Sequence, residues 1–114
     1  MTMPAFDFGY LTLFTNDLER TRAFYEAIGI TFARHENAEV VSYSTTLRNG
    51  VYLTFKSGAP SYCELHFGVQ AYGGVKRKLV ALGYQESLEG RVNPRGTYTF
   101  YDPDGRKVGL DEFG

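Results

Sequence analysis

The sequence has little of several residue types that mark particular classes of protein. Its 114 residues include a single cysteine, Cys63, and no tryptophan. One cysteine excludes an intrachain disulfide and a zinc site built on cysteine pairs, and it fits a reducing compartment such as the cytoplasm. Glycine-rich phosphate loops, Gly-x-Ser-x-Gly elbows and heptad repeats are also missing. The sequence therefore gives no support to the nucleotide-binding, serine-hydrolase or coiled-coil classes that these motifs identify.

An excess of charge of one sign is lacking too. The 12 basic and 13 acidic residues give a net charge of −1. This balance leaves no electrostatic surface that would favour nucleic acid or an anionic membrane. Residues 1–5 contain no basic segment followed by an apolar stretch, so we expect neither a signal peptide nor a membrane span. We therefore expect a cytoplasmic protein whose partners are neither nucleic acid nor membrane.

The most informative feature that is present is an internal repeat. A strand-like segment at Tyr10–Phe14 leads into a candidate helix that stops at Gly29, and a second such segment at Glu64–Gly68 leads into one that stops at Gly83. The spacing from strand to glycine is the same in both copies. Two copies of one supersecondary unit indicate a duplicated domain. We expect a single domain over residues 1–114, with module one at about 6–57 and module two at about 60–114.

Hydrophobic periodicity predicts the same order of elements in both modules. In module one, Asn16 and Glu19 form a candidate capping box for the helix, and Asn49-Gly50 predicts a hairpin. In module two, Val75, Leu79 and Leu82 would share the buried face of the helix. The predicted strands cover residues 8–14, 30–36, 39–45 and 51–56, then 62–69, 84–89, 97–101 and 107–112. Residues 90–96 are expected to form a mobile loop, whose Arg91 and Arg95 could cover a pocket.

Two segments carry a resemblance to a known family. Asn16–Tyr25, after the first strand, and Asp102–Leu110, near the C-terminus, resemble motifs of the vicinal oxygen chelate superfamily. That superfamily includes glyoxalase I, extradiol dioxygenases and bleomycin-resistance proteins. With the repeat, the resemblance covers nearly the whole chain. It implies an α+β fold of two tandem βαβββ modules, with curved sheets around a cavity and helices on the outer faces, usually in a homodimer.

The resemblance also identifies where a metal would be held. Metal-dependent members place ligands near the start of the first strand and the end of the last strand of each module. These positions correspond here to Tyr10, Thr54, Glu64 and Gly109. Only Glu64 is a routine ligand for a divalent ion, and His66 on the same strand face would add a second. Because a catalytic centre needs about three protein ligands, we expect neither metal nor cofactor.

Strand alternation separates a core face from a face suited to a ligand. The apolar residues that point toward the helices are Leu11, Leu13, Val51, Leu53, Phe55, Cys63, Leu65, Phe67, Val108 and Leu110. The opposite face combines aromatic rings with hydroxyls and a few charges, which is typical of a small-molecule pocket. Its candidate ligand-binding residues are Tyr10, Thr12, Phe14, Tyr52, Thr54, Tyr62, Glu64, His66 and Gly109.

Simpler roles remain open for these residues. Glu64 could pair with Lys56 or Lys107 across the sheet, and His66 could be a hydrogen-bonded interior histidine. Any one of the tyrosines could be an ordinary sheet residue with its hydroxyl in water.

The sequence favours a metal-independent protein of the glyoxalase and bleomycin-resistance type that binds a small molecule, for example by sequestering a planar antibiotic or metabolite. The alternative is a lyase, isomerase or dioxygenase-like enzyme, cofactor-free or dependent on a divalent metal, in which Glu64 or His66 acts as general base. A third hypothesis is a dimeric interaction module with a collapsed cavity, which would tolerate Gly109→Leu.

Overall fold

The computed structural model describes residues 9–87 and 97–113, which contain seven strands and two helices. The strands form a four-stranded and a three-stranded sheet, and the described part of the chain contains no closed barrel. The predicted α+β class is therefore confirmed. The expected mobile loop with Arg91 and Arg95 lies outside the described residues.

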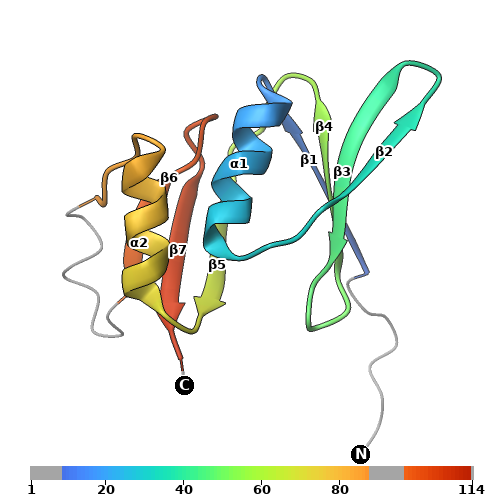
Figure 1. Cartoon of the computed structure of the whole chain (residues 1–114). Coiled ribbons are helices and arrows are strands. Elements are labelled where there is room, and N and C mark those ends of the chain that lie inside the picture. Colours follow the sequence, from blue (N-terminus) through green and yellow to red (C-terminus); the bar gives the residue numbers. More distant parts are fainter. Residues whose placement is uncertain (1–8, 88–96, 114) are drawn as a thin grey trace, which may run out of the picture.

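Module one forms the four-stranded sheet, and its strand order is β1-β4-β3-β2 (Figure 1). Strand β1 pairs with β4 in parallel, whereas β3 pairs with both β4 and β2 in antiparallel fashion. The elements of module one are β1 (Tyr10–Thr15), α1 (Leu18–Ile28), β2 (Ala33–Asn37), β3 (Val40–Thr46) and β4 (Tyr52–Ser57).

Module two repeats this topology in the three-stranded sheet, whose order is β5-β7-β6. Its first strand again lies at an edge and pairs in parallel with the last strand, while β6 and β7 are antiparallel. In place of the predicted strand at 84–89, the described residues contain an isolated bridge between Ser87 and Thr99. The elements are β5 (Glu64–Val69), α2 (Tyr72–Ala81), β6 (Tyr98–Tyr101) and β7 (Lys107–Glu112).

Helix α1 begins one residue later than the predicted capping box. Asp17 is the N-cap, and its side chain accepts a hydrogen bond of 3.1 Å from the backbone amide of Arg20. The predicted cap at Asn16 was therefore wrong. Glu19, the expected partner in the box, instead accepts a 2.6 Å hydrogen bond from the hydroxyl of Tyr43. The helix ends at Gly29, whose φ of 121° favours glycine.

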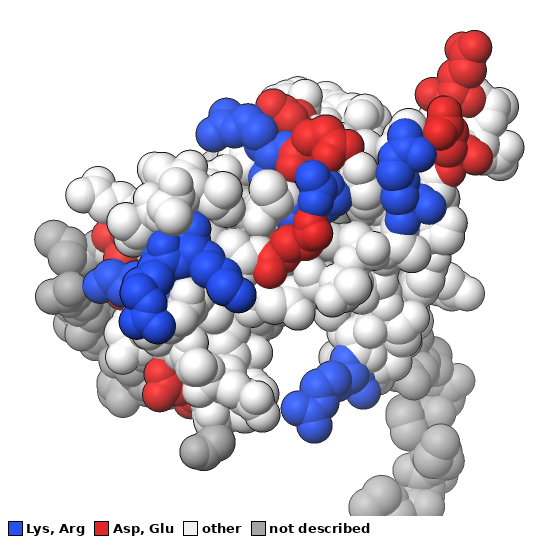
Figure 2. All heavy atoms as spheres, in the orientation of Figure 1, with Lys and Arg blue, Asp and Glu red and all other residues white. Residues whose placement is uncertain are grey.

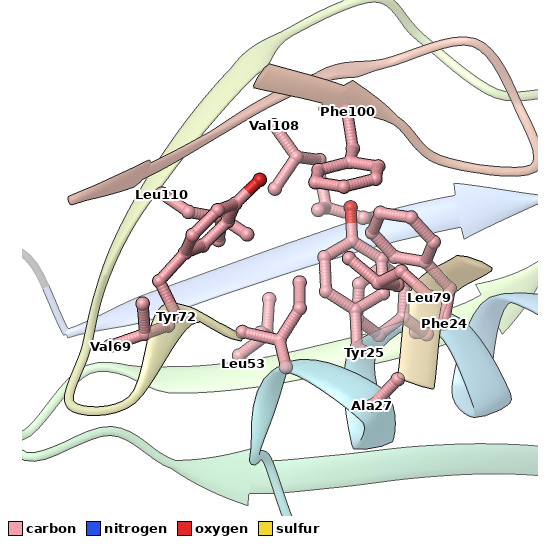
Figure 3. Close-up of a cluster of buried hydrophobic side chains, with 13 residues drawn as sticks. Phe24, Tyr25, Ala27, Leu53, Val69, Tyr72, Leu79, Phe100, Val108 and Leu110 are labelled. Carbon is pink, nitrogen blue, oxygen red and sulfur yellow. The ribbon is translucent and has the colours of Figure 1, made fainter. Parts of the chain in front are cut away.

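Both helices lie on one side of the two sheets, and the core fills the space between them (Figures 1 and 3). Tyr25 of α1 joins the sheets, because its ring stacks on Phe55 of β4 at 4.8 Å and meets Phe67 of β5 edge-on at 5.9 Å. The predicted core face is confirmed, since its residues are buried or pack against the buried cluster. Leu82 is an exception: it caps α2 beyond the last helical turn and is 49% exposed.

The turn between β6 and β7 connects module two to module one through buried charges. Arg106 is 1% exposed, and its guanidinium donates to the carboxylates of Asp102 at 2.9 Å and Asp104 at 3.1 Å. It also donates to the backbone carbonyl of Phe14 in β1. The hydroxyl of Tyr25 donates to Asp102 at 2.7 Å, and burial together with that carboxylate raises the pKa of Tyr25. These contacts fix the end of β1 against the turn of module two.

Candidate functional site

The face of each sheet that points away from the helices is open. Within the described ranges no helix covers it (Figure 1). Several of its aromatic rings are exposed. Tyr10 is 78% exposed, Tyr62 is 70% exposed and Phe14 is 42% exposed. Strand pairing places Tyr10 beside Tyr52, and their rings meet edge-on with centroids 6.0 Å apart. Thr12 lies beside Thr54 in the same register. The structure thus brings together five of the predicted ligand-binding residues on the four-stranded sheet.

The open face of the four-stranded sheet also carries a hydrogen-bonded group that the sequence analysis missed. Ser44 of β3 is 2% exposed, and its hydroxyl accepts a 2.7 Å hydrogen bond from the hydroxyl of Tyr52. The same hydroxyl lies 2.7 Å from Nε2 of His35 in β2. The alternation of β2 and β3 puts His35 and Ser44 on one face, but this signal is readable only once the hairpin register is known.

Two cavities adjoin this group, and Tyr52 and Thr46 line both. The first has a volume of about 500 Å³ and includes Tyr10 in its wall. The second has a volume of about 410 Å³ and is lined by His35, Ser44 and Ala33, among others. Each is an open depression within one chain, so a ligand held there would keep much of its surface in water.

The open face of the three-stranded sheet carries Glu64, His66 and Gly109, and Tyr62 lies in the segment that precedes β5. Glu64 is exposed and accepts a 3.1 Å hydrogen bond from the hydroxyl of Tyr62. Lys107 lies beside Glu64 in the strand register, but the described residues contain no ion pair between Glu64 and either Lys107 or Lys56. His66 lies on the same face two residues along β5, and it is exposed rather than interior.

Two glycines on this face, Gly68 and Gly109, leave no free space for a ligand within one chain. A Cβ at Gly109 would lie 2.4 Å from Nδ1 of His66, because the imidazole packs directly over the glycine. A Cβ at Gly68 would lie 2.7 Å from the ring of Phe113. Side-chain rings of the same chain therefore occupy both spaces, and the imidazole of His66 packs against Gly109.

A larger cleft of about 640 Å³ lies along the free edge of β5. Its walls come from β5, from the segment after α1 and from the turn between β3 and β4. His66 is the one residue of the predicted site in its lining, together with Arg48, Asn49 and Phe113. The other predicted ligand-binding residues therefore lie outside this cleft.

The helix side of the molecule is not a candidate site. Figure 2 shows acidic and basic side chains intermixed over α1 and a group of basic side chains over α2. On α1, Arg22 pairs with Glu19 at 3.0 Å and with Glu26. Hydrogen bonds from Tyr43 and Arg22 hold the pKa of Glu19 below its usual range. These are solvated helix surfaces, and the basic residues over α2 include the run at 76–78.

The residues at the metal-ligand positions do not fit a divalent metal centre. Glu64 is the single carboxylate at those positions, Tyr10 and Thr54 present neutral hydroxyls, and Gly109 lies beneath an imidazole. The described residues contain no group of three histidine, cysteine, aspartate or glutamate side chains placed to hold one ion. A catalytic metal with about three protein ligands therefore has no donor set among residues 9–87 and 97–113 of one chain.

Comparison with known proteins identifies the fold. No protein-family model matches the sequence, and no curated protein is similar to it. Among solved structures, the chain is similar to the fosfomycin resistance protein FosX from Listeria monocytogenes, in a structure complexed with Mn(II) and 1S,2S-dihydroxypropylphosphonic acid. The TM-score is 0.74 at 19% identity, and the match covers 98% of this chain and 95% of that chain.

Two further structures support the same conclusion. A possible glyoxalase from Bacillus cereus matches with a TM-score of 0.69 at 17% identity, over 94% of this chain and 99% of that chain. Oxidase ChaP-H2 matches with a TM-score of 0.66 at 12% identity, over 97% of this chain and 96% of that chain. The chain has the fold of vicinal oxygen chelate proteins, and at these identities the likeness shows the fold alone. No described helix is long and apolar enough to span a membrane.

Proposed function

We propose that the protein is a homodimer that binds a planar small molecule in a cavity enclosed by the open faces of two copies, without a metal. The observation that carries this proposal is the exposure of aromatic rings on those faces, with Tyr10 at 78% and Tyr62 at 70%. Exposed apolar surface of this kind marks an interaction site. Rings beside hydroxyls are also the usual lining of a small-molecule pocket.

A second copy is needed because one chain leaves the site incomplete. Pockets bury most of a small ligand, whereas the depressions at Tyr52 are open on one side. The two open faces of one chain lie on separate sheets that do not close on each other. Two-fold pairing would place a face from each copy opposite the other, which is the commonest symmetry of soluble oligomers. The ligand would then contact residues of both chains.

The residues of the faces suggest how the ligand is held. Tyr10, Phe14 and Tyr62 would stack against its plane, and the hydroxyls of Thr12 and Thr54 would contact its polar edge. Glu64 and His66 would supply polar anchors from the other sheet. Such a binding protein would sequester an antibiotic or a metabolite in the cytoplasm.

The proposal is tested by native mass spectrometry followed by thermal-shift titration with planar aromatic compounds, in the presence of EDTA. We expect a dimer that planar compounds stabilise. Tyr10→Ala combined with Tyr62→Ala should weaken binding by about tenfold, because each aromatic pair contributes about 0.5–1.5 kcal/mol. Leu82→Ala is the matched control, since Leu82 is exposed on the helix side. A monomer that binds normally would contradict the shared cavity.

A second candidate function is a divalent-metal-dependent enzyme. It is favoured by one observation, the Mn(II) in the similar FosX structure. In this chain it would depend on Glu64 and His66, with further ligands from a second copy. Stoichiometric Mn(II) or Zn(II) in the purified protein, lost in Glu64→Gln, would establish this alternative and contradict the metal-free proposal.

A further inference from the structure

Three polar side chains on the open face of the four-stranded sheet form a continuous chain of hydrogen bonds. Nε2 of His35 lies 2.7 Å from Oγ of Ser44, and the hydroxyl of Tyr52 donates to the same Oγ over 2.7 Å. The three residues come from the adjacent strands β2, β3 and β4. The hydrogen-bonded chain begins at Tyr52, which lines both neighbouring cavities, and ends at an imidazole.

The hydrogen bonds among these three side chains run in one direction, from Tyr52 through Ser44 to His35. Ser44 carries one hydroxyl proton, and its oxygen already accepts the proton of Tyr52. The proton of Ser44 is therefore available to Nε2 of His35, which accepts it when the imidazole proton lies on Nδ1. Because Ser44 is 2% exposed, bulk water has little access to its hydroxyl. The arrangement is a proton path that leads from a cavity wall to a base.

The charges around this path favour a negatively charged ligand. On the same face, the strand register places Ser42 beside His35 and Lys56 beside Ser42. No carboxylate lies on this face of the described strands β1 to β4. Arg34 and Glu36, the sequence neighbours of His35, point to the other face and pair with each other at 2.9 Å. The three-stranded sheet differs, because Glu64 and Asp111 lie on its open face.

We propose that this face binds a planar ligand with an acidic hydroxyl, a phenol or an enol, as its anion. The ligand O–H bond breaks and its proton passes to the oxygen of Tyr52. Tyr52 gives its own proton to Ser44, and Ser44 gives its proton to Nε2 of His35. The products are a bound phenolate or enolate and an imidazolium, so atoms and charge balance without another reactant. This inference rests on the proposed function, because it specifies the ligand class of that cavity.

The first test is the state of His35 in the ligand-free protein. The chain has two histidines, so ¹H–¹⁵N NMR can resolve both rings. In the neutral imidazole of His35 we expect the proton on Nδ1, with Nε2 as the acceptor of the Ser44 hydroxyl. A proton on Nε2 of neutral His35 would overturn the proposal, because that nitrogen could then not receive another.

The second test uses 4-nitrophenol, whose phenolate absorbs visible light while the neutral phenol does not. We expect the bound probe to be ionised at a pH where the free probe is mostly protonated. His35→Gln keeps a polar side chain but removes the base, and Ser44→Ala interrupts the path. Both should abolish the ionisation shift and weaken binding of the anion about tenfold. Ser44→Thr, which restores the hydroxyl, should recover the shift.

Controls separate the path from its surroundings and from the proposed function. Ser42→Ala removes a neighbouring hydroxyl on the same strand and should leave the shift intact. A shift lost in His66→Gln and kept in His35→Gln would overturn the proposal. Nitrobenzene is a planar analogue of 4-nitrophenol that lacks the hydroxyl. If it binds as tightly as 4-nitrophenol, the result supports the ligand cavity and contradicts the proton path. If neither compound binds, both proposals fail.

Discussion

The turn of module one and the turn of module two have the same backbone but different roles. In each, the residue that opens the turn accepts a hydrogen bond from a glycine amide: Leu47 from Gly50 at 2.8 Å, and Asp102 from Gly105 at 2.9 Å. Both glycines have positive φ, 91° and 84°. Yet the first turn is exposed and lines a cleft, whereas the second is anchored to β1 by Arg106, whose buried guanidinium also binds the buried Asp102. Local chemistry sets the shape of the turn, and side chains decide what the turn contacts.

Replacing Arg106 in the module-two turn should cause the largest loss of stability. Arg106→Met leaves the buried Asp102 carboxylate without its guanidinium, and breaking a buried pair typically costs about 3–5 kcal/mol. The free energy of unfolding, measured in urea, should fall by about that amount. The matched control is Arg48→Met in the exposed turn of module one, which should change stability by less than about 0.5 kcal/mol. Equal losses in the two variants would contradict a specific role for the module-two turn.

The two turn glycines should respond alike if the turns are determined locally. Gly50→Ala and Gly105→Ala each force an L side chain into positive φ, which costs about 1–2 kcal/mol. An added Cβ meets no atom within 4 Å at either position, so the strain is purely conformational. Differential scanning calorimetry of both variants measures this cost. A loss at Gly105 several times that at Gly50 would mean that the buried network also constrains the backbone.

The helices offer the next contrast, because the N-cap residue of α1 makes a side-chain capping bond and that of α2 does not, although the amide of Tyr72 donates to the carboxylate of Glu112 at 3.2 Å. Ala71 is the N-cap of α2 and makes no side-chain capping bond, while Asp17 caps α1. Ala71→Ser should stabilise the protein by about 1 kcal/mol, and Asp17→Ala should destabilise it by about the same amount. Urea unfolding of both variants tests this prediction. A neutral Ala71→Ser would indicate that tertiary contacts at Tyr72 and Leu79 alone define the start of α2.

The smallest expected effect concerns acid stability. Hydrogen bonds from Tyr43 and Arg22 lower the pKa of Glu19 in the folded protein, so their contribution is present above the ordinary value of 4.5 and is lost as the pH falls through the folded value. Tyr43→Phe removes one of these donors. Wild type should exceed the variant in unfolding midpoint at pH 7, and the difference should shrink at pH 3. A difference independent of pH would assign the effect of Tyr43 to packing.

The sequence predicted the elements far better than it predicted the site. Strand alternation identified the core face correctly, because period-two burial is a local property of each strand. Helical periodicity was wrong for Leu82, which is the C-cap residue after α2 and is exposed. Strand alternation missed His35 and Ser44, which become neighbours only through the β2–β3 register. Arg106 lies in the segment Asp102–Leu110 that carried the family resemblance, but its contacts include the carbonyl of Phe14 in β1, far away in the chain.

The sequence by itself determined the repeated strand–helix order, the α+β class and the apolar faces of the strands, since each follows from local periodicity. Tertiary structure decided which polar side chains meet. It placed the charges of Asp102 and Arg106 at the junction of the modules and packed His66 against Gly109. It also brought Tyr52, Ser44 and His35 into one series of hydrogen bonds. These contacts join residues from separate strands and turns, so strand register and packing fix their distances, and no local pattern encodes them.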